Sequence, residues 1–575
     1  MGMDPFLAKA FHESEHKPKA NIDILRGLTV RQMDFLPESI DKIWQTAAKD
    51  FPPQVKYLGW KPCTVLEEYN NEPRPKRGSG RETDVAPNNI YMNEYRLGFV
   101  HPDGTIEKLP PTYLFLPYVG DGGMLWLSGA QWSISPMLGD QVLSFEKDRV
   151  FCQLSRAKFH IENVNHPIHI DGRVAEFNVP WSVLYNISSS KESIKITLLH
   201  YVLATKGLKR TLNHVVPMLG EIRLFETMGE AEEAMKAVPR TEWVAVEGSK
   251  LKTKPFYGGS NIVAVIDKAK WESAPLWTRT VIASLFFTLD RFSPGGSEYW
   301  GSEMKADPRW SEDVSRWRLL MGLVLWERTK NPGIIMDDIN KHMASLDRYI
   351  DDLVRPRAAR IGFTGNNLYD FFEMIIKEWE DWRLNGYKKS APIYDKELNA
   401  LYQVNNKIMQ AIFHFYFNLV NEADKGNLTP DNIKKLLKKF IRTRMIYSIR
   451  IDSNRYVAPI AYSSDNMFCK PTAIVVPQRG NSAGGEGQGA AATRLHASIS
   501  EVTSPLNLTK KDSTGLTRLS PFVMLDGLMY VIRNPDIAPI TDRVQAILDK
   551  DMRESTVEDD LDIDELSRIS RDNDE

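Results

Sequence analysis

Apolar residues recur at helical spacing in much of the chain after about residue 270. Between residues 366 and 384 they line one face of a predicted helix, which should end at Asn385-Gly386. Residues 397–420 repeat the pattern. Thr429-Pro430-Asp431 has the residue types of a helix N-terminus and predicts a third helix from there to about Thr443.

Residues 116–138 show a different pattern, in which short apolar runs alternate with glycine-containing turns. Such turns between aromatic and β-branched runs are typical of β-hairpins. The pattern predicts a strand that ends at Pro117, a strand over Met124–Leu127 and a strand over Gln131–Ile134. The turns between these strands should lie at residues 121–123 and at Ser128-Gly129.

The segment from residue 142 to 203 is also β-rich, with strand-like runs at Arg149–Leu154 and Ile194–Leu203. Strands and helices are therefore mixed along the chain, and we expect an α+β fold. The order of the patterns favours a β-rich and helical insert between two halves of another domain.

The length of 575 residues allows three or more domains with substantial cores. The 42% apolar and 26% charged residues are ordinary for a globular protein. No apolar run reaches the 18 or so residues that span a bilayer, and the N-terminus lacks the apolar core of a secretory signal. Three widely spaced cysteines indicate a reducing compartment and argue against a structural zinc site.

The net charge of −2 hides an uneven distribution. Residues 551–575 contain eleven acidic residues and three arginines, whereas residues 434–455 contain eight lysines and arginines and one acid, Asp452. A basic cluster suggests contact with a polyanion. A solvated helix face is the commoner explanation of such a cluster.

Two stretches resemble the β subunit of multisubunit RNA polymerases. The hairpin at 116–138 is similar to one near the base of that subunit's protrusion: Leu116-Pro117 and Gly123 match its start, and Ser128-Gly129 stands where the family has Asn-Gly. The second stretch is 504–518, SPLNLTKKDSTGLTR, which is similar to the family's fork loop and the adjoining rifampicin pocket. Its matching residues fall in the family's order, with a shorter loop between the two parts of the motif.

A third match is RIDSNR at Arg450–Arg455, at the point where the family's protrusion resumes after the lobe. The family uses an Asp and an Arg there to bind a downstream guanine, but two residues between Asp452 and Arg455 are missing here. A local Asp–Arg pair in a turn explains this segment equally well. Together the three matches resemble the N-terminal half of a β subunit that is split between chains, as in phiKZ-like giant bacteriophages.

The resemblance implies a multidomain chain, whose parts are an N-terminal arm (1–33), protrusion-like segments (34–140 and 441–500), a lobe-like insert (141–440), a fork-like region (501–545) and an acidic tail (546–575). It implies a non-catalytic subunit of a DNA-directed RNA polymerase that forms one pincer of the DNA cleft. The expected partners are a C-terminal β-like chain, β′-like chains that hold the catalytic Mg²⁺, and a promoter-specificity subunit. Double- and single-stranded DNA and the RNA–DNA hybrid would lie in the cleft, and no membrane is involved. The enzyme would act in the infected bacterial cell, in the cytoplasm or in a phage compartment, and packaging in the virion stays open.

The chain itself offers no catalytic residue, metal ligand or cofactor site, and the basic loops can contact phosphates without base specificity. The residues that we expect to contact DNA are Lys510, Lys511, Arg518, Asp452, Arg455, Arg450, Lys438, Arg442 and Arg444. Three histidines lie close in sequence, and we interpret them as structural: His160, His166 and His169. The spacing of Asp560, Asp562 and Asp564 is that of a magnesium motif, but they lie in the acidic tail and should be solvated.

Two other functions fit the same sequence. A phage structural or scaffold protein without a polymerase role would explain the mixed fold and the acidic tail. A single-strand-binding protein that acts alone would explain the basic cluster. The proteins that accompany the chain in purification distinguish the first alternative, and tight DNA binding without partners would mark the second.

Overall fold

The computed structural model describes residues 36–71, 90–120, 124–127, 130–134, 137–140, 142–145, 149–182, 184, 195–249, 261–290, 312–325, 331–383, 396–399, 402–443, 445, 457–459, 473–475, 498, 501–502, 516–518, 520, 522–526, 531–547 and 550. The chain forms two compact units. Unit 1 comprises residues 1–140 and 390–575, and unit 2 comprises residues 141–389. Unit 2 therefore interrupts unit 1 in the sequence.

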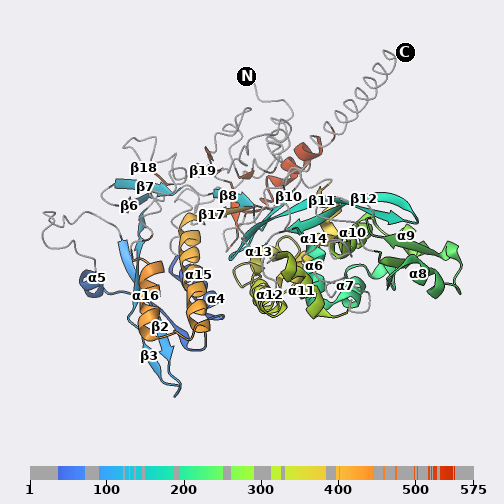
Figure 1. The fold of residues 1–575 in the computed structure, drawn as a ribbon. Coiled ribbons are helices and arrows are strands. Elements are labelled where there is room, and N and C mark those ends of the chain that lie inside the picture. Colours follow the sequence, from blue (N-terminus) through green and yellow to red (C-terminus); the bar gives the residue numbers. More distant parts are fainter. Residues whose placement is uncertain are drawn as a thin grey trace, which may run out of the picture. The chain divides into compact units, whose positions relative to one another are not determined.

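Unit 1 contains a four-stranded antiparallel sheet with the long strand β2 at its centre (Figure 1). Its strands are β1 (Val55–Pro62), β2 (Ile90–Val100), β3 (Ile106–Lys108) and β4 (Thr112–Pro117). The helices of this part are α4 (Leu36–Ala48), α5 (Val65–Asn71), α15 (Tyr402–Asp424) and α16 (Pro430–Phe440). The register of β1 against β2 shifts between Tyr57 and Gly59, and Gly59 has a φ of +100° that favours glycine.

An aromatic cluster holds α4, β1 and α15 together. The Trp44 ring is buried, stacks on Tyr57 at a centroid distance of 5.7 Å and meets the edge of Phe415 at 5.9 Å. The Tyr57 hydroxyl donates a hydrogen bond of 2.7 Å to Asp41 Oδ1, so its polar end is satisfied within the cluster. The apolar side of α15 therefore packs into unit 1. The insert expected over 141–440 ends at residue 389 in the structure, because the helices after it belong to this packing.

Three small sheets complete unit 1. One has the strand order β18-β7-β6-β5, another has the order β17-β8-β19-β20, and β21 pairs with β22. Their strands are β5 (Val119–Gly120), β6 (Met124–Leu127), β7 (Ala130–Ile134), β8 (Met137–Asp140), β17 (Lys396–Asn399), β18 (Val457–Pro459), β19 (Ala473–Val475), β20 (Leu516–Arg518), β21 (Met524–Leu525) and β22 (Val531–Ile532). The hairpin expected from the glycine-containing turns is confirmed as the antiparallel pair β6–β7.

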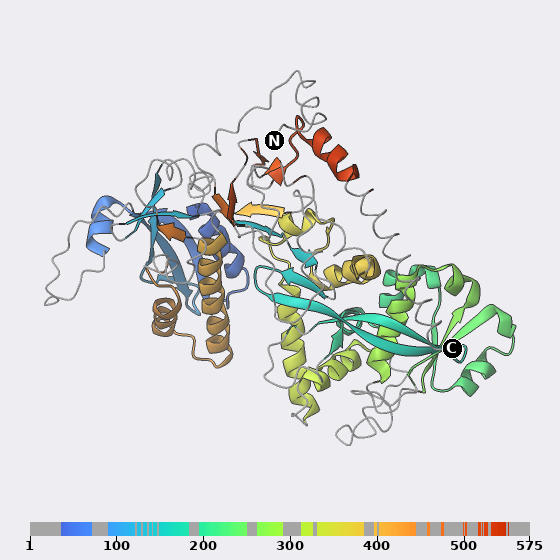
Figure 2. The same ribbon diagram turned by 90° about the horizontal axis from the view of Figure 1, so that it is seen from above.

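Unit 2 is built on a sheet with the order β13-β12-β11-β15-β16-β14, and β10 and β9 extend it beside β11. Its strands are β9 (Leu143–Phe145), β10 (Arg149–Gln153), β11 (Lys158–Ile170), β12 (Arg173–Ser182), β13 (Ile196–Thr197), β14 (Arg223–Phe225), β15 (Trp243–Glu247) and β16 (Val263–Asp267). The long hairpin β11–β12 is visible in Figure 2. Asp171 and Gly172 connect its strands with φ values of 48° and 79°, as a two-residue turn requires.

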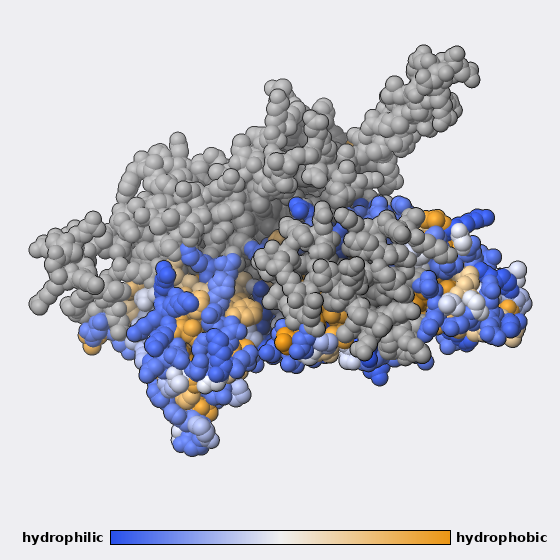
Figure 3. Space-filling model, in the orientation of Figure 1, coloured by the Kyte–Doolittle hydropathy of each residue, from blue (hydrophilic) through white to orange (hydrophobic). Residues whose placement is uncertain are grey.

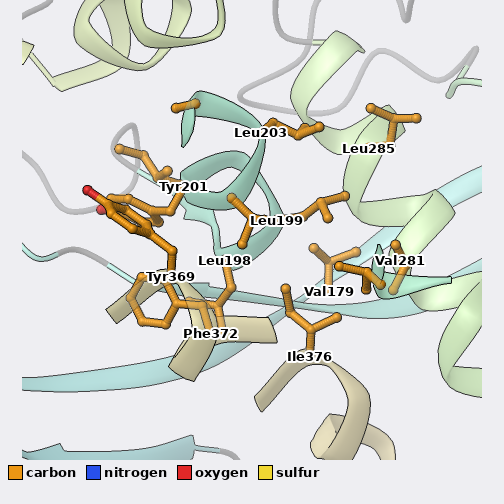
Figure 4. Close-up of a cluster of buried hydrophobic side chains, with 14 of the residues drawn as sticks. Val179, Leu198, Leu199, Tyr201, Leu203, Val281, Leu285, Tyr369, Phe372 and Ile376 are labelled. Carbon is orange, nitrogen blue, oxygen red and sulfur yellow. The ribbon is translucent and has the colours of Figure 1, made fainter. Parts of the chain in front are cut away.

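Helices pack against this sheet and enclose the larger core of the protein. They are α6 (Leu198–Lys206), α7 (Leu208–Val215), α8 (Met228–Ala234), α9 (Lys268–Ser273), α10 (Leu276–Asp290), α11 (Val314–Leu325), α12 (Pro332–Asp347), α13 (Arg355–Ala359) and α14 (Leu368–Asp381), with short 3₁₀ helices at Pro217–Leu219 and Arg240–Glu242. Figure 4 shows how side chains from β12, α6, α10 and α14 meet, among them Val179, Leu199 and Phe372. This burial is the main stabilising contribution in unit 2.

Several expected elements are confirmed. Strand β10 ends one residue before the predicted limit, and α14 begins after Asn367, whose side chain accepts a hydrogen bond from the Asp370 amide. Helix α16 begins at Pro430, as predicted from the cap at Thr429. The α+β class is confirmed by the mixture of helix and sheet. The N-terminal arm lies outside the described residues, and so does the acidic tail apart from residues 546, 547 and 550.

Two expectations are wrong. The strand expected over Ile194–Leu203 contains only β13, and the chain then enters α6, whose N-cap is Thr197. All residues from Leu198 to Ala204 are buried, so the helix lacks the polar face that would reveal its period in the sequence. The helix expected over 397–420 is preceded by β17, which pairs with β8, and starts only at Tyr402.

Candidate nucleic-acid interface

Two of the sequence segments that resemble a polymerase subunit supply strands to two small sheets of unit 1, and the strand that follows the remaining segment in the sequence joins one of these sheets. The first segment forms β5 to β8. The strand after the RIDSNR segment, β18, pairs with β7, so that Val457 is opposite Ile134. The segment 504–518 supplies β20, which pairs with β19, and β19 is parallel to β8. Segments more than 300 residues apart in the sequence therefore share two small sheets.

Of the residues expected here, only Arg518 lies in a described element, as the last residue of β20. Lys510, Lys511, Arg450, Asp452 and Arg455 lie outside the described residues. The structure thus brings together the strands that flank these motifs, and the contacts of the charged side chains stay a prediction.

A small buried polar cluster fixes the described part of the fork-like region. Glu501 is 1% exposed. Its carboxylate accepts hydrogen bonds from the Thr541 hydroxyl at 2.7 Å and from the backbone N–H of Asn534 at 3.2 Å. The Ser520 amide donates to the Val502 carbonyl at 2.7 Å. Residues 502 and 520 therefore lie side by side, on either side of the segment that contains Lys510 and Lys511. Buried carboxylates need such partners, so this cluster holds the region in one arrangement.

The second group of expected residues lies on and just after α16. Lys438 and Arg442 are exposed, while Arg444 lies outside the described residues. Lys435 and Lys439 are also exposed, at positions three residues before and one residue after Lys438. We call the set of Lys435, Lys438, Lys439 and Arg442 the basic patch. Figure 3 shows hydrophilic residues over the α16 side of unit 1, with apolar residues between them.

Lys435 and Lys439 belong to the basic cluster of residues 434–455 but were not among the residues expected to contact DNA. The signal that could have found them is their spacing. Residues at i, i+3 and i+4 lie on one side of a helix. The opposite side of α16 carries Ile433 and Leu437, which are buried. The three lysines therefore project away from the core of unit 1.

The histidines expected to be structural do not share a site. His166 is buried and forms a contact of 3.1 Å from Nε2 to Asp290 Oδ2. Among the described residues no group of three or more His, Cys, Asp or Glu side chains is placed to hold a metal ion. Burial raises the pKa of both described thiols, Cys63 to about 11 and Cys152 further, so neither is a thiolate at neutral pH.

The buried carboxylate of Asp290 leads to a prediction for unit 2. Besides the contact with His166, it accepts a hydrogen bond of 2.8 Å from the Ser249 amide. A Cβ at Gly248 would overlap Asp290 Oδ1. We expect Gly248→Ala to lower the free energy of unfolding by about 3 kcal/mol. Either the added Cβ remains in steric overlap with Asp290, or the Asp290 side chain moves and loses its hydrogen bonds to Ser249 and His166. Urea unfolding followed by tryptophan fluorescence measures the loss.

Gly229→Ala is the matched control for this prediction. Gly229 lies in α8, and the nearest atom to an added Cβ is Thr227 Oγ1 at 3.9 Å. Alanine favours the helix over glycine, so this change should be neutral or stabilise by about 0.5 kcal/mol. Equal effects of the two substitutions would show that Gly248 is not needed for the close approach of Asp290.

Comparison with known proteins gives one family. The family model described as "Non-virion RNA polymerase subunit" matches residues 4–556. No curated protein matches the chain. Among the described helices, none combines the length and apolar character needed to cross a bilayer.

Proposed function

Because this chain belongs to the family of non-virion RNA polymerase subunits, we propose that it is the N-terminal part of a split β-like subunit. The family makes it a phage RNA polymerase subunit, which works together with partner subunits. The description as non-virion also favours an enzyme that acts in the infected cell over one that is packaged in the virion.

One observation carries the β-like assignment. The segments similar to the β subunit are far apart in the sequence. The strand that follows RIDSNR, β18, pairs with β7 of the first segment, and β20 of segment 504–518 is linked to β8 through β19. Chance matches would have no reason to pack together. A β-like subunit would explain why segments similar to its protrusion and its fork belong to linked sheets.

In this role the chain forms one pincer of the DNA cleft and binds DNA through basic side chains. Nucleotidyl transfer in such an enzyme uses Mg²⁺ held by a partner β′-like chain. The chain itself contributes the cleft wall, with the fork-like region held in place by Glu501. The buried cluster around this residue holds residues 502 and 520, which flank Lys510 and Lys511 in the sequence, and we expect these lysines to contact phosphates.

The family assignment argues against a structural or scaffold protein without a polymerase role. The experiment that separates the two is affinity purification of the tagged chain from infected cells, followed by mass spectrometry. We expect polymerase chains, including one with a D-F-D-G-D motif and one with the C-terminal half of β. Recovery of capsid or shell proteins alone would refute the proposal.

The fork-like region gives a second test. In the assembled enzyme, replacing Lys510, Lys511 and Arg518 with Ala should weaken DNA binding and flatten its salt dependence. Each lost phosphate contact lowers the salt slope by roughly 0.7–0.9. Titration of labelled DNA at several salt concentrations measures the slope.

A matched control removes three cations that are paired with carboxylates in unit 2. Arg223, Lys236 and Lys268 form ion pairs with Glu221, Glu233 and Glu272. Their triple Ala variant should leave the slope near its original value. An unchanged slope in the fork variant, with intact assembly, would mean that this loop is a basic surface turn without contact to DNA.

A further inference from the structure

The basic patch concentrates positive charge that the described structure does not neutralise. None of Lys435, Lys438, Lys439 and Arg442 forms an ion pair with a described carboxylate. On the same helical hairpin, Lys425 and Lys434 do have partners, Glu422 at 3.0 Å and Asp431 at 3.3 Å. Like charges at i, i+3 and i+4 repel one another. Lys438 and Lys439 lie in the last turn of α16, where the helix dipole stabilises positive charge. Lys435 lies before that turn and gains little from the dipole.

Aromatic side chains lie next to these cations. Lys439 Nζ is 5.0 Å from the centroid of the Phe440 ring, and that ring is 6.3 Å from the His414 ring of α15. Phe417 lies three residues after His414, and 44% of it is exposed. Since α15 packs against α16, the exposed side of α15 continues the surface that carries the basic patch.

We propose that the basic patch and the neighbouring aromatic side chains bind single-stranded DNA. Cations next to exposed aromatic rings are the combination that binds single strands without sequence preference, since phosphates pair with the cations and unpaired bases stack on the rings. In a duplex the bases already stack on one another, so the aromatic rings would add nothing. The three lysines span about 6 Å of helix axis, enough for contact with neighbouring phosphates.

The choice of DNA as the strand rests on the proposed function, because a DNA-directed polymerase separates the strands of its template. The binding itself does not depend on partner chains. Failure of this site and failure of the polymerase role are therefore distinguishable: the first is measured with the full chain alone, and the second by which proteins purify with it.

The test uses fluorescence anisotropy of a labelled oligo(dT) of about 12 nucleotides, titrated with the full chain at several salt concentrations. Lys435→Gln with Lys438→Gln should weaken binding and lower the salt slope by about 1.4, which corresponds to two contacts at 0.7 each. The control is Lys425→Gln with Lys434→Gln, which removes the same charge from paired lysines of the same hairpin. It should change the slope by less than about 0.5.

The aromatic part of the proposal has its own readout. Phe417→Ala should weaken oligo(dT) binding about fivefold or more and leave the salt slope unchanged, because stacking releases no counterions. Circular dichroism checks that each variant keeps its helices. Equal slopes for the two lysine variants, or unchanged binding by Phe417→Ala, would overturn the proposed site.

Two competitors identify the ligand class. A DNA duplex of the same length should compete less well than oligo(dT), and oligo(rU) should not compete better. A duplex that competes as well as oligo(dT) would overturn the assignment to single strands, and tighter binding of oligo(rU) would overturn the assignment to DNA.

A chain that ends at Lys550 tests whether the acidic residues 551–575 occupy the basic patch, because it lacks them. If the shortened chain binds oligo(dT) and the full chain does not, the acidic segment occupies the basic patch in the full chain, which would overturn the proposed site.

Discussion

Purified by itself, the chain should show only background RNA synthesis on a primed template with magnesium and nucleotides. The sequence lacks the E-T-P-E-G segment and the lysines and acids that the β family places near the catalytic centre. The described residues contain no cluster of three carboxylate, histidine or cysteine side chains that could hold a metal ion. We expect activity many orders of magnitude below that of an assembled enzyme. Robust magnesium-dependent synthesis by the chain alone would contradict this.

The acidic tail gives the control for this prediction. Asp560, Asp562 and Asp564 have the spacing of the catalytic magnesium motif, and they lie outside the described residues. Replacing all three with Asn in the assembled enzyme should leave elongation near normal, because solvated aspartates in a tail do not form a metal site. Loss of synthesis to the level of a true metal-ligand variant would show that the tail contributes to catalysis.

Rifampicin should act poorly on the assembled enzyme, with an inhibitory concentration at least about a hundredfold above that for a bacterial polymerase. The segment that matches the family's drug pocket is His496–Ser504, HASISEVTS, which differs at nearly every position from the family's S-Q-L-S-Q-F-M-D-Q-N-N. Lys510 stands where the family has His. A pocket that binds its ligand by hydrogen bonds loses affinity when those partners change.

The structure adds a reason at the residue nearest to the family's drug-contacting Asp. The Glu501 carboxylate is 1% exposed and holds Thr541 and Asn534, so it is committed to the protein's own hydrogen bonds. Transcription at increasing drug concentration measures the effect, with a bacterial polymerase in parallel as the control for drug potency. Equal inhibition of both enzymes would refute the alignment of this segment.

Local chemistry explains which elements the sequence could predict. The hairpin β6–β7 and the starts of α14 and α16 are set by turn and cap residues next to one another in the chain, such as Ser128-Gly129 and Thr429-Pro430. Helix α6 is buried on all sides and has no polar face, so its apolar run was interpreted as a strand. The turn between β11 and β12 consists of Asp171-Gly172, a dipeptide that by itself indicates a hairpin in the sequence.

Contacts between distant segments explain what the sequence could not predict. The boundary of unit 2 depends on α15 packing its Phe415 against Trp44, more than 300 residues earlier. The pairing of β18 with β7 is likewise set by tertiary contacts that no local pattern reveals. Of the candidate site, the sequence predicted Lys438 and Arg442 as DNA-contacting cations on a helix that runs to about Thr443. In the structure α16 ends at Phe440, so Arg442 lies just after it. Which neighbouring cations lack a described carboxylate partner becomes visible only in the structure.

A structure of the assembled polymerase on a DNA template, determined by electron cryomicroscopy, tests the central claim most directly. We predict that this chain forms one wall of the cleft, next to a chain that supplies the C-terminal half of β. The strands β6, β7, β18 and β20 should face the nucleic acid. A chain located on the outside of the enzyme, with these strands away from the DNA, would contradict the assignment as a β-like subunit.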